Sequence, residues 1–401
     1  MEDLYQWIKQ HIDLAQYAQQ VYGYQLDKSR SSKNSKVLIH PSESHRIVVS
    51  RREQNGHFCY FNPMDEQDKG TIVDFLVYRE GSWDKVVDKL SNLSDTSQAV
   101  QYPVFPEEEL DPDEEQVESL SHRDFLHDRG LSDRTLDHPW FAGRILTHKR
   151  LIDDKTMVNT AFPLFGLKQP MGYELKNHGF HGYSTGSKKS RACWMSMTPP
   201  ADSIYDLFLF ESAIDALSYH QLHPPMEDHF RQYMSFGGQI SDGQITLLQT
   251  LVDRHPPQRI FLCMDRDNSG QFYALSIAGK LQSPIKLSSI LAVSHRRDNL
   301  CLLEFHLSGT FAEPFRVQAF QETIRHAQRL AAPALADRLP LYIEAPYPDY
   351  QILHSGFPIN NHTLSICVRT VLASRGLKDW MILVLPQGKD FNDDLMDHMN
   401  K

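Results

Sequence analysis

The sequence predicts a multidomain protein that combines α+β and α/β parts, and three observations support this. The chain has 401 residues, which is too long for a single average domain. Acidic residues interrupted by prolines lie between Pro103 and Glu118, a composition typical of an exposed linker, with a DNA-mimicking or autoinhibitory arm as the alternative. Beyond Asp202, short apolar runs alternate with helical segments, as in an α/β domain with a parallel sheet.

The overall composition narrows the possible partners. The formal net charge of -10 argues against a uniformly basic nucleic-acid coat, although a local basic patch could still bind nucleic acid. Residues 1–20 lack the apolar core of a signal peptide, and no stretch reaches the roughly 18 apolar residues of a membrane helix. We therefore expect a cytoplasmic protein without a membrane partner. The five cysteines are scattered without a CxxC pair, which favours reduced thiols over disulfides or a closed zinc site.

The N-terminal 95 residues are expected to form a small α+β module. Apolar residues recur at helical spacing over residues 4–21, which predicts a first helix. Strand-like runs follow at 36–39, 46–51 and 57–61. The stretch that begins at Gly70 indicates a glycine turn that leads into a second helix.

The segment after the acidic stretch predicts a helix, a pair of strands and a basic loop. The helix is expected over residues 121–130, and the strands over 159–167 and 172–175. The loop at 182–191 is rich in glycine and hydroxyl groups, and its cations are candidates for nucleotide or DNA contact, with a solvated hairpin tip as the alternative. These cations are Lys188, Lys189 and Arg191.

Acidic residues follow two strands that are expected to be buried. The apolar run 207–210 ends at Glu211, and the run 259–264 ends at Asp265 and Asp267. Functional sites of open α/β sheets lie at the carboxyl ends of the strands, so these three carboxylates are expected to converge there. Oxygen ligands of this kind suit Mg²⁺ or Mn²⁺. An isolated DxD motif more often caps a helix than binds a metal ion. The prediction of a metal site therefore depends on the combination of acidic residues at the ends of both strands.

Two further strand ends are predicted near this edge. Gly237 and Gly238 follow an apolar run and would let the backbone approach a phosphate, or leave room for a metal ion. A later apolar run at 380–385 leads to a segment that contains Lys389 and Asp390. Asp390 is therefore an additional candidate metal ligand, and Lys389 is a candidate contact for nucleotide or DNA.

The acidic segments resemble the motifs of TOPRIM domains, which bacterial primases, topoisomerases and certain nucleases share. The resemblance rests on residues 210–218 (FESAIDALS) and 264–270 (MDRDNSG). The closing segment 388–395 (GKDFNDDL) is similar to the end of the TOPRIM variant of plasmid and mobile-element primase-like proteins. The chain departs from the family in having Ser212 where a glycine is usual. About a hundred residues also separate the DxD helix from the closing strand, which indicates an insertion.

The resemblance implies roles for these residues and an order of domains. Glu211, Asp265 and Asp267 would be catalytic, and together with Asp390 they would bind Mg²⁺ or Mn²⁺. The segment before the TOPRIM motifs resembles the basic module of the primase polymerase core. The expected domains are a zinc-ribbon-like module (1–95), an acidic linker (96–120), the basic primase-core module (121–200), the first part of a Rossmann-like TOPRIM domain (201–285), an insertion of unclear role (286–376) and the TOPRIM closing strand with its acidic motif (377–401).

The N-terminal module resembles the zinc ribbon of bacterial primase without its full set of ligands. Such a ribbon needs three Cys and one His, and only His40 and Cys59 lie near suitable positions. Asn62 falls where another cysteine is expected, so zinc is not expected here. The basic residues of the module, with aromatic neighbours, would suit single-stranded DNA, and the alternative is a charged face balanced by salt and water. Arg51 and Arg52 are the chosen candidates.

The leading hypothesis is a metal-dependent DNA primase-like nucleotidyltransferase of a plasmid or other mobile element, acting on single-stranded DNA with nucleotides. No GxxxxGK[ST] motif occurs, so a helicase would be a separate partner protein. A TOPRIM nuclease of a defence or DNA-processing system is the first alternative, because it uses the same carboxylates. A catalytically decayed DNA-binding or assembly subunit is the second. A topoisomerase is disfavoured because no accompanying domain offers a persuasive nucleophilic tyrosine.

Overall fold

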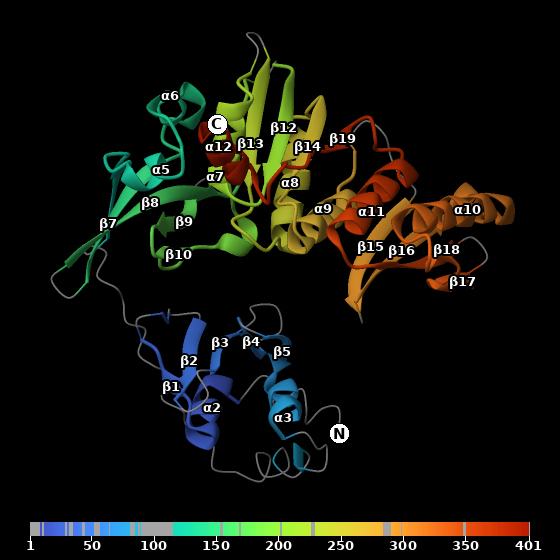
Figure 1. Ribbon diagram of the computed structural model, residues 1–401, viewed down its shortest axis with the longest axis horizontal. Coiled ribbons are helices and arrows are strands. Elements are labelled where there is room, and N and C mark those ends of the chain that lie inside the picture. Colours follow the sequence, from blue (N-terminus) through green and yellow to red (C-terminus); the bar gives the residue numbers. More distant parts are fainter. Residues whose placement is uncertain are drawn as a thin grey trace. The chain divides into compact units, whose positions relative to one another are not determined.

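The computed structural model of the chain divides into two compact units, residues 1–111 and 112–401, which are called the first and the second unit below (Figure 1). The structure describes residues 9, 12–28, 30–31, 35–41, 45–51, 57–63, 65–80, 85–86, 89, 115–152, 155–167, 170–200, 203–225, 229–283, 290–297, 299–347 and 350–400. Most of the linker predicted over 96–120 lies outside these residues, and so does Arg52. The last part of that predicted linker, Glu115–Ser119, forms strand β6 of the second unit.

In the first unit, a five-stranded antiparallel sheet of described residues follows the chain order β1-β2-β3-β4-β5. Its elements are α2 (Leu14–Tyr22), β1 (Gln25–Leu26), β2 (Ser35–His40), β3 (His45–Arg51), β4 (Phe58–Asn62), β5 (Asp65–Thr71) and α3 (Ile72–Glu80). Helix α2 begins at Asp13, whose carboxylate accepts hydrogen bonds from two backbone amides of the first turn, and ends at Gly23 in the left-handed conformation. The predicted strands and the helix after Gly70 are confirmed, whereas β5 was not predicted.

A buried ion pair lies within the first unit, beside its apolar core. Asp68 on β5 has no exposed side-chain surface, and its carboxylate accepts hydrogen bonds from Arg79 on α3 at 2.9 Å and from the Tyr60 hydroxyl at 2.6 Å. The Arg79 guanidinium also lies 3.7 Å from the centre of the Phe75 ring. Burial alone would raise the pKa of Asp68, but hydrogen bonds from Arg79 and Tyr60 lower it below its ordinary value. The pair therefore holds α3 against β4 and β5.

In the second unit, ten strands of described residues form one mixed sheet. Its main path runs β10-β9-β8-β11-β13-β12-β14-β19, and β7 joins β8 to β6. The strands after β6 are β7 (Leu146–Ile152), β8 (Lys155–Phe165), β9 (Pro170–Asn177), β10 (Phe180–Tyr183), β11 (Cys193–Met195), β12 (Tyr205–Phe210), β13 (Phe230–Ser235), β14 (Arg259–Cys263) and β19 (Met381–Leu383). Strands β13, β12, β14 and β19 run parallel, and β6 to β11 pair antiparallel. Because β11 pairs with both β8 and β13, the segments predicted as 121–200 and 201–285 share one continuous sheet.

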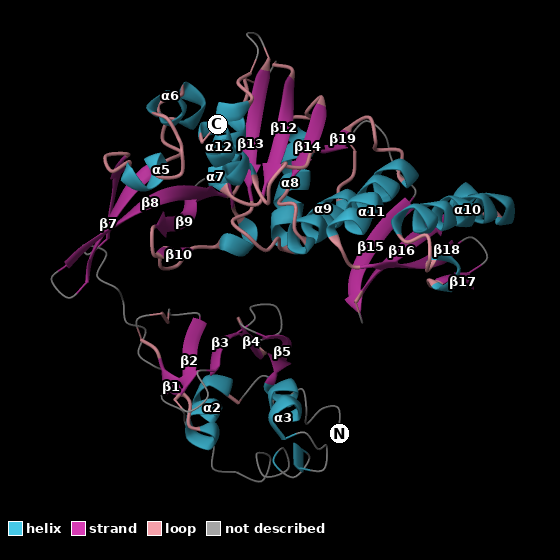
Figure 2. Ribbon diagram, viewed as in Figure 1, coloured by secondary structure: helices cyan, strands magenta, loops and turns pink. Residues whose placement is uncertain are grey.

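Helices cover both faces of the parallel part of this sheet (Figure 2). They are α7 (Ala213–Leu222) and α12 (Phe391–Met399) on one face, and α8 (Asp242–Arg254) and α9 (Asn268–Lys280) on the other. Strand β12 is buried on both faces: Leu207 and Leu209 contribute to the core under α8 and α9, and Phe208 and Phe210 to the core under α7 and α12. This alternation explains why its sequence is a continuous apolar run. Before β7, the predicted helix over 121–130 is replaced by two short helices, α5 (Asp124–His127) and α6 (Asp133–Leu136).

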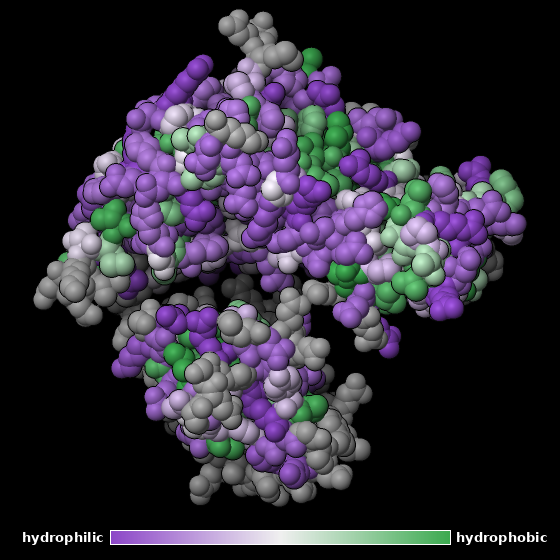
Figure 3. All heavy atoms as spheres, in the orientation of Figure 1, coloured by the Kyte–Doolittle hydropathy of each residue, from purple (hydrophilic) through white to green (hydrophobic). Residues whose placement is uncertain are grey.

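The predicted insertion forms a compact α+β module between α9 and β19. It repeats a hairpin followed by a helix: β15 (Ile290–Arg297), β16 (Leu300–Ser308) and α10 (Pro314–Ala331), then β17 (Leu341–Tyr347), β18 (Tyr350–Pro358) and α11 (Asn361–Ser374). The described strands form an antiparallel sheet in the order β15-β16-β18-β17. Figure 3 shows hydrophobic residues among the hydrophilic ones on the visible surface of this module. Phe315 and Tyr342 are among its exposed apolar side chains.

Arg375 fixes this insertion to the rest of the second unit. Its buried guanidinium donates to the carbonyl of Ile290 in β15 and to that of Leu281 after α9, each at 2.9 Å. Burial lowers the pKa of Arg375 to about 10. Apolar side chains of the insertion and of the parallel sheet also belong to one continuous core.

The predicted fold class, a multidomain protein with α+β and α/β parts, is confirmed. All five cysteines are buried thiols. No described helix combines the length and the apolar character needed to cross a membrane.

We predict that Asp68→Ala destabilises the first unit, because it leaves the buried charge of Arg79 without its carboxylate. The free energy of unfolding of this unit should fall by about 3 kcal/mol, as for other broken buried ion pairs. Hydrogen exchange of the full-length protein would show the loss as faster exchange in α3 and β4. Arg30→Ala is the matched control, because it removes only a surface contact with Asp27 at 3.7 Å and should change little. Equal exchange in both variants would contradict the role of the Asp68–Arg79 pair.

Candidate functional site

The parallel strands of the second unit place acidic residues at one edge of the sheet. Phe210, the last residue of β12, lies beside Cys263 of β14 and Ser235 of β13 in the strand register. Glu211 follows directly after Phe210, and Asp265 lies two residues after Cys263. The carboxyl ends of parallel strands meet at the same edge, so these side chains are brought together.

Glu211 is held with part of its carboxylate unsatisfied. Its Oε2 atom is buried and accepts no hydrogen bond from the described residues. Burial, as the largest cause, together with the negative charges of Asp267 and Asp215, raises the pKa of Glu211 to about 7. A buried carboxylate oxygen without a partner is costly, and a donor or a cation would stabilise it.

Asp265 lies at the centre of an acidic cluster. Burial raises its pKa most strongly, and four other carboxylates add to the shift, those of Asp215, Glu211, Asp390 and Asp267. The pKa of Asp215 is also raised, first by burial and then by Asp390. These five residues are called the acidic cluster below. The sequence predicted four of its members and missed Asp215.

Two members of the acidic cluster also cap helices. Asp267 accepts a hydrogen bond from the backbone amide of Gly270 at 2.9 Å and begins α9. Asp390 accepts one from Asp393 at 2.8 Å and begins α12. The acceptor in each bond is the Oδ1 atom, so both residues act as helix N-caps. The Oδ2 atoms do not take part in these capping bonds.

Ser212, at the position where TOPRIM domains usually have glycine, begins α7. Its backbone is extended, with φ −129°, so no glycine is required by conformation there. Its hydroxyl accepts a hydrogen bond from the Asp215 amide at 3.4 Å. The substitution is therefore compatible with the turn that presents Glu211.

A backbone hydrogen bond joins the loop that carries Asp265 and Asp267 to the loop that carries Asp390. The Arg266 amide donates to the Lys389 carbonyl at 2.7 Å, and Asp394 accepts hydrogen bonds from the amides of Gln387 and Gly388. The Lys389 ammonium lies in the field of the cluster. Burial lowers its pKa, but the negative charges of Asp265 and its neighbours raise it by more. Lys389 therefore provides positive charge at this edge.

The glycine turn after β13 packs against the antiparallel part of the sheet. Gly237 and Gly238 both have positive φ, 64° and 88°. The Tyr183 hydroxyl donates to the Gly237 carbonyl at 2.5 Å, and a Cβ atom on Gly237 would lie only 2.8 Å from that hydroxyl. Nothing lies within 4 Å of a Cβ built on Gly238. Gly237 is thus needed for packing, whereas Gly238 has open space where a side chain would lie, and its amide donates to the Glu211 carbonyl at 3.1 Å.

The basic loop lies beside this glycine turn. The Lys189 ammonium donates to the carbonyl of Gln239. Burial lowers its pKa, while the negative charges of Glu174 and Glu211 act in the opposite direction. Lys188 and Arg191 are exposed on the same loop. Of the basic candidates in the first unit, Arg51 ends β3 and Arg52 lies outside the described residues.

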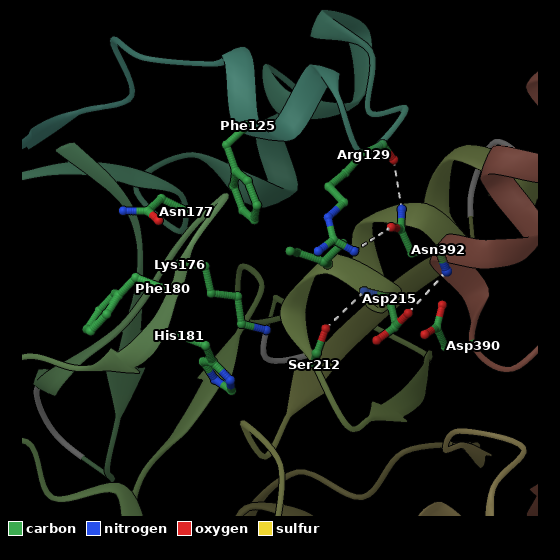
Figure 4. A pocket seen from close by; sticks show the side chains of 11 residues that line it. Phe125, Arg129, Lys176, Asn177, Phe180, His181, Ser212, Asp215, Asp390 and Asn392 are labelled. Carbon is green, nitrogen blue, oxygen red and sulfur yellow. Dashed lines mark hydrogen bonds between the residues drawn. The ribbon is translucent and has the colours of Figure 1, made fainter. Parts of the chain in front are cut away.

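A pocket separates two members of the acidic cluster, Asp215 and Asp390, from a basic wall formed by Lys176 and His181 (Figure 4). Lys176 and His181 on β9 and β10 line one wall, and Ser212, Asp215 and Asp390 line the other. The remaining lining residues are Phe125, Arg129, Asn177, Phe180, Ile214 and Asn392.

Asn392 lines the pocket and donates hydrogen bonds to its surroundings. Its side-chain amide donates to the Arg129 carbonyl at 2.7 Å and to the Ser218 hydroxyl at 3.0 Å, and its backbone amide donates to Asp215 at 3.1 Å. One asparagine therefore connects three segments that are far apart in the sequence.

Sequence reasoning missed the charged residues of the basic wall. Glu174 and Lys176 lie two positions apart on β9, and both side chains are buried. A pair of charges at positions that share one face of an otherwise apolar strand is a signal that could have identified them. His181 lay within the segment before the basic loop and carried no such signal.

The acidic cluster fits a divalent cation in ligand type and in charge. Carboxylate oxygens are the ligands that Mg²⁺ and Mn²⁺ prefer, and a cation would relieve the mutual repulsion that raises the pKa values. Within the described ranges, however, no three His, Cys, Asp or Glu side chains are already grouped so as to hold a metal ion. The donor set is present, and its side chains would have to turn toward a common centre.

A comparison with known protein families matches the segment that carries three residues of the acidic cluster. Residues 208–299 match the family model described as Toprim-like, and this range contains Glu211, Asp265 and Asp267. The chain therefore contains a Toprim-like domain. No curated protein matches the chain.

Two solved structures show weak similarity to the chain. One is the bacteriophage T7 lagging-strand DNA polymerase interacting with primase domains of two gp4 subunits bound to an RNA/DNA hybrid and dTTP. It has 15% identity and a TM-score of 0.30, with 46% of this chain and 83% of the other covered. The other is the primase fragment of the bacteriophage T7 primase-helicase protein, at 15% identity, a TM-score of 0.28, and 41% and 61% coverage. Similarity at this level does not establish a shared activity.

We predict that Asp265→Asn stabilises the metal-free protein. The folded state binds the Asp265 proton more tightly than the unfolded chain does, because burial and its neighbours raise its pKa. Wild-type stability should therefore fall as the pH rises above the ordinary carboxyl range, and the variant should avoid this loss. Thermal unfolding in EDTA at pH 8 should show a melting temperature higher by a few degrees, about 2–4 °C per kcal/mol.

Added Mg²⁺ should then raise the melting temperature of the wild type and have little effect on the variant. Asp253→Asn, on the exposed side of α8, is the control for the loss of one carboxylate. A lower melting temperature for Asp265→Asn in EDTA, with an unchanged response to Mg²⁺, would contradict the repulsion described for the cluster.

Proposed function

We propose that the chain is a metal-dependent primase-like nucleotidyltransferase that acts on single-stranded DNA. The observation that carries this proposal is the acidic cluster at the end of the parallel strands, two members of which, Asp215 and Asp390, face the buried Lys176 across a pocket. A cluster of carboxylates opposite cationic side chains suits a substrate that carries both phosphates and metal ions. The Toprim-like match over residues 208–299 supports the same chemistry.

In this proposal Glu211, Asp265 and Asp267 hold Mg²⁺ or Mn²⁺, with Asp390 as an additional ligand. The metal would supply charge neutralisation at the phosphates of the nucleotide. Lys189 and Lys389, which both lie in the electrostatic field of Glu211, would bind phosphate oxygens. Gly238, which has open space where a side chain would lie, would leave room for the same phosphates.

Lys188 and Arg191 are exposed on the basic loop and would contact the template strand. In the first unit, Phe61 is exposed and would stack on a base, whereas Tyr60 is buried against Asp68. Arg51 and Arg52 remain candidates for phosphate contact there. We further propose that this unit is a zinc-free descendant of a primase zinc ribbon, held by its apolar core and by the Asp68–Arg79 pair.

The resemblance of residues 388–395 to mobile-element primase-like proteins supports an origin in a plasmid or other mobile element. Strand opening would then require a separate helicase partner. We propose that the protein acts in the cytoplasm, where the substrate DNA and nucleotides are found.

The test is incorporation of labelled ribonucleotides and deoxyribonucleotides on single-stranded DNA with Mg²⁺ or Mn²⁺. Wild type should make short products, and the Asp265→Asn/Asp267→Asn variant should lose them by about 100-fold or more, because the charge that binds the metal is removed. Asparagine is chosen because it still caps α9 at position 267. Asp253→Asn serves again as the control.

Other outcomes would assign a different function. Cleavage of the DNA without nucleotides, abolished in the same variant, would replace the primase by a nuclease. Tight binding of single-stranded DNA without either activity, unchanged by EDTA, would make the chain a binding or assembly subunit.

A further inference from the structure

Glu174 is a buried carboxylate that pairs with Lys176 and His181. Its side chain has no exposed surface, and its Oε1 atom lies 3.1 Å from the Lys176 ammonium and 2.9 Å from His181 Nε2. Burial raises the pKa of Glu174, but Lys176 and His181 lower it by more, so the carboxylate is ionised. An ionised carboxylate can only accept hydrogen bonds, and it therefore fixes the direction of both contacts.

The contact with Glu174 determines which nitrogen of His181 carries the proton. Nε2 must donate to Oε1, so a neutral imidazole has the lone pair of Nδ1 free. Lys176 balances the charge of Glu174 within the same group. A buried carboxylate that orients an imidazole in this way is a recurring arrangement in enzymes that move protons.

His181 is placed where substrate would bind. The imidazole lines the pocket beside Lys176, and about half of its side chain is exposed to it and to solvent (Figure 4). The charged groups across the pocket are Asp215 on α7, Asp390 at the start of α12 and Arg129 after α5. A hydroxyl group bound between the basic and the acidic walls would therefore meet the imidazole.

We propose that His181 is the general base of the nucleotidyl transfer and that Glu174 is its positioning residue. The inference rests on the proposed function and extends it to a group outside the Toprim-like domain. It leaves the acidic cluster, Glu211 included, free to act in metal binding.

The 3′-hydroxyl of the growing strand gives its proton to Nδ1 of His181, and its oxygen attacks the α-phosphorus of a nucleoside triphosphate. The new O–P bond forms while the bond between the α-phosphorus and the bridging oxygen breaks. That electron pair leaves with pyrophosphate, and the imidazolium later releases its proton to solvent.

The first arm of the experiment compares primer extension by wild type, His181→Ala and Glu174→Gln across pH. Loss of a general base should lower the rate of His181→Ala by about 100-fold or more and remove the histidine limb of the pH profile. Added imidazole should restore part of the rate in His181→Ala. Glu174→Gln should show a smaller loss, because the imidazole remains but is no longer held in one tautomer.

His178→Ala is the matched control. His178 lies in the turn between the same two strands but pairs with Asp128 at 3.5 Å, and its rate and pH profile should match those of wild type. A wild-type rate for His181→Ala would overturn the inference. A loss without imidazole rescue and with an unchanged pH profile would also overturn it, because a merely structural role behaves in that way.

A second arm does not depend on activity. Nitrogen-15 NMR of the histidine side chains, with the His181 signals assigned by their absence in His181→Ala, should show a proton on Nε2 that shifts in Glu174→Gln. A proton on Nδ1 would overturn the inference even if the chain is a primase. If wild type makes no product in the first arm, the proposed function fails, and the NMR result still decides whether Glu174 orients His181.

Discussion

Repulsion between carboxylates at one edge of a sheet is the constraint on which the second unit depends. Glu211, Asp265 and Asp390 follow strands that run parallel, so burying those strands forces the acids together. The fold offsets part of the repulsion with hydrogen bonds, because Asp267 and Asp390 each accept one from the first turn of a helix. The Glu211 Oε2 atom is left without a partner among the described residues, and the pKa of Asp265 stays raised. These carboxylates, whose repulsion and hydrogen-bonding capacity are not fully satisfied, are therefore suited to bind a cation.

The antiparallel strands of the second unit complete the site. Strand β11 joins them to the parallel strands in one sheet, so the basic wall is fixed relative to the acidic edge by backbone pairing. The hydroxyl of Tyr183 and the ammonium of Lys189 then hold the glycine turn beside Glu211. The basic residues of β9 and β10 therefore belong to the same rigid framework as the carboxylates, although they lie outside the Toprim-like match.

Local sequence patterns predicted the acidic edge but not the wall opposite it. Glu211 and Asp265 could be predicted because each follows an apolar run that only a buried strand explains. Asp215 was missed because it lies inside a helix, where its approach to Asp390 depends on how α7 packs on α12. Glu174 and His181 were missed because their contact is set by the pairing of two strands. The repeated hairpin-and-helix order of the insertion was also missed, because only its separate elements have local signals.

The most direct measurement is the crystal structure of the full-length protein grown with MnCl₂, using anomalous scattering to locate manganese. A peak bounded by Glu211, Asp265 and Asp267, with their carboxylates turned toward it, is the predicted result. No peak at this edge at millimolar Mn²⁺, or a peak held by other residues, would show that the acidic cluster does not bind a metal, and would contradict the function proposed for it.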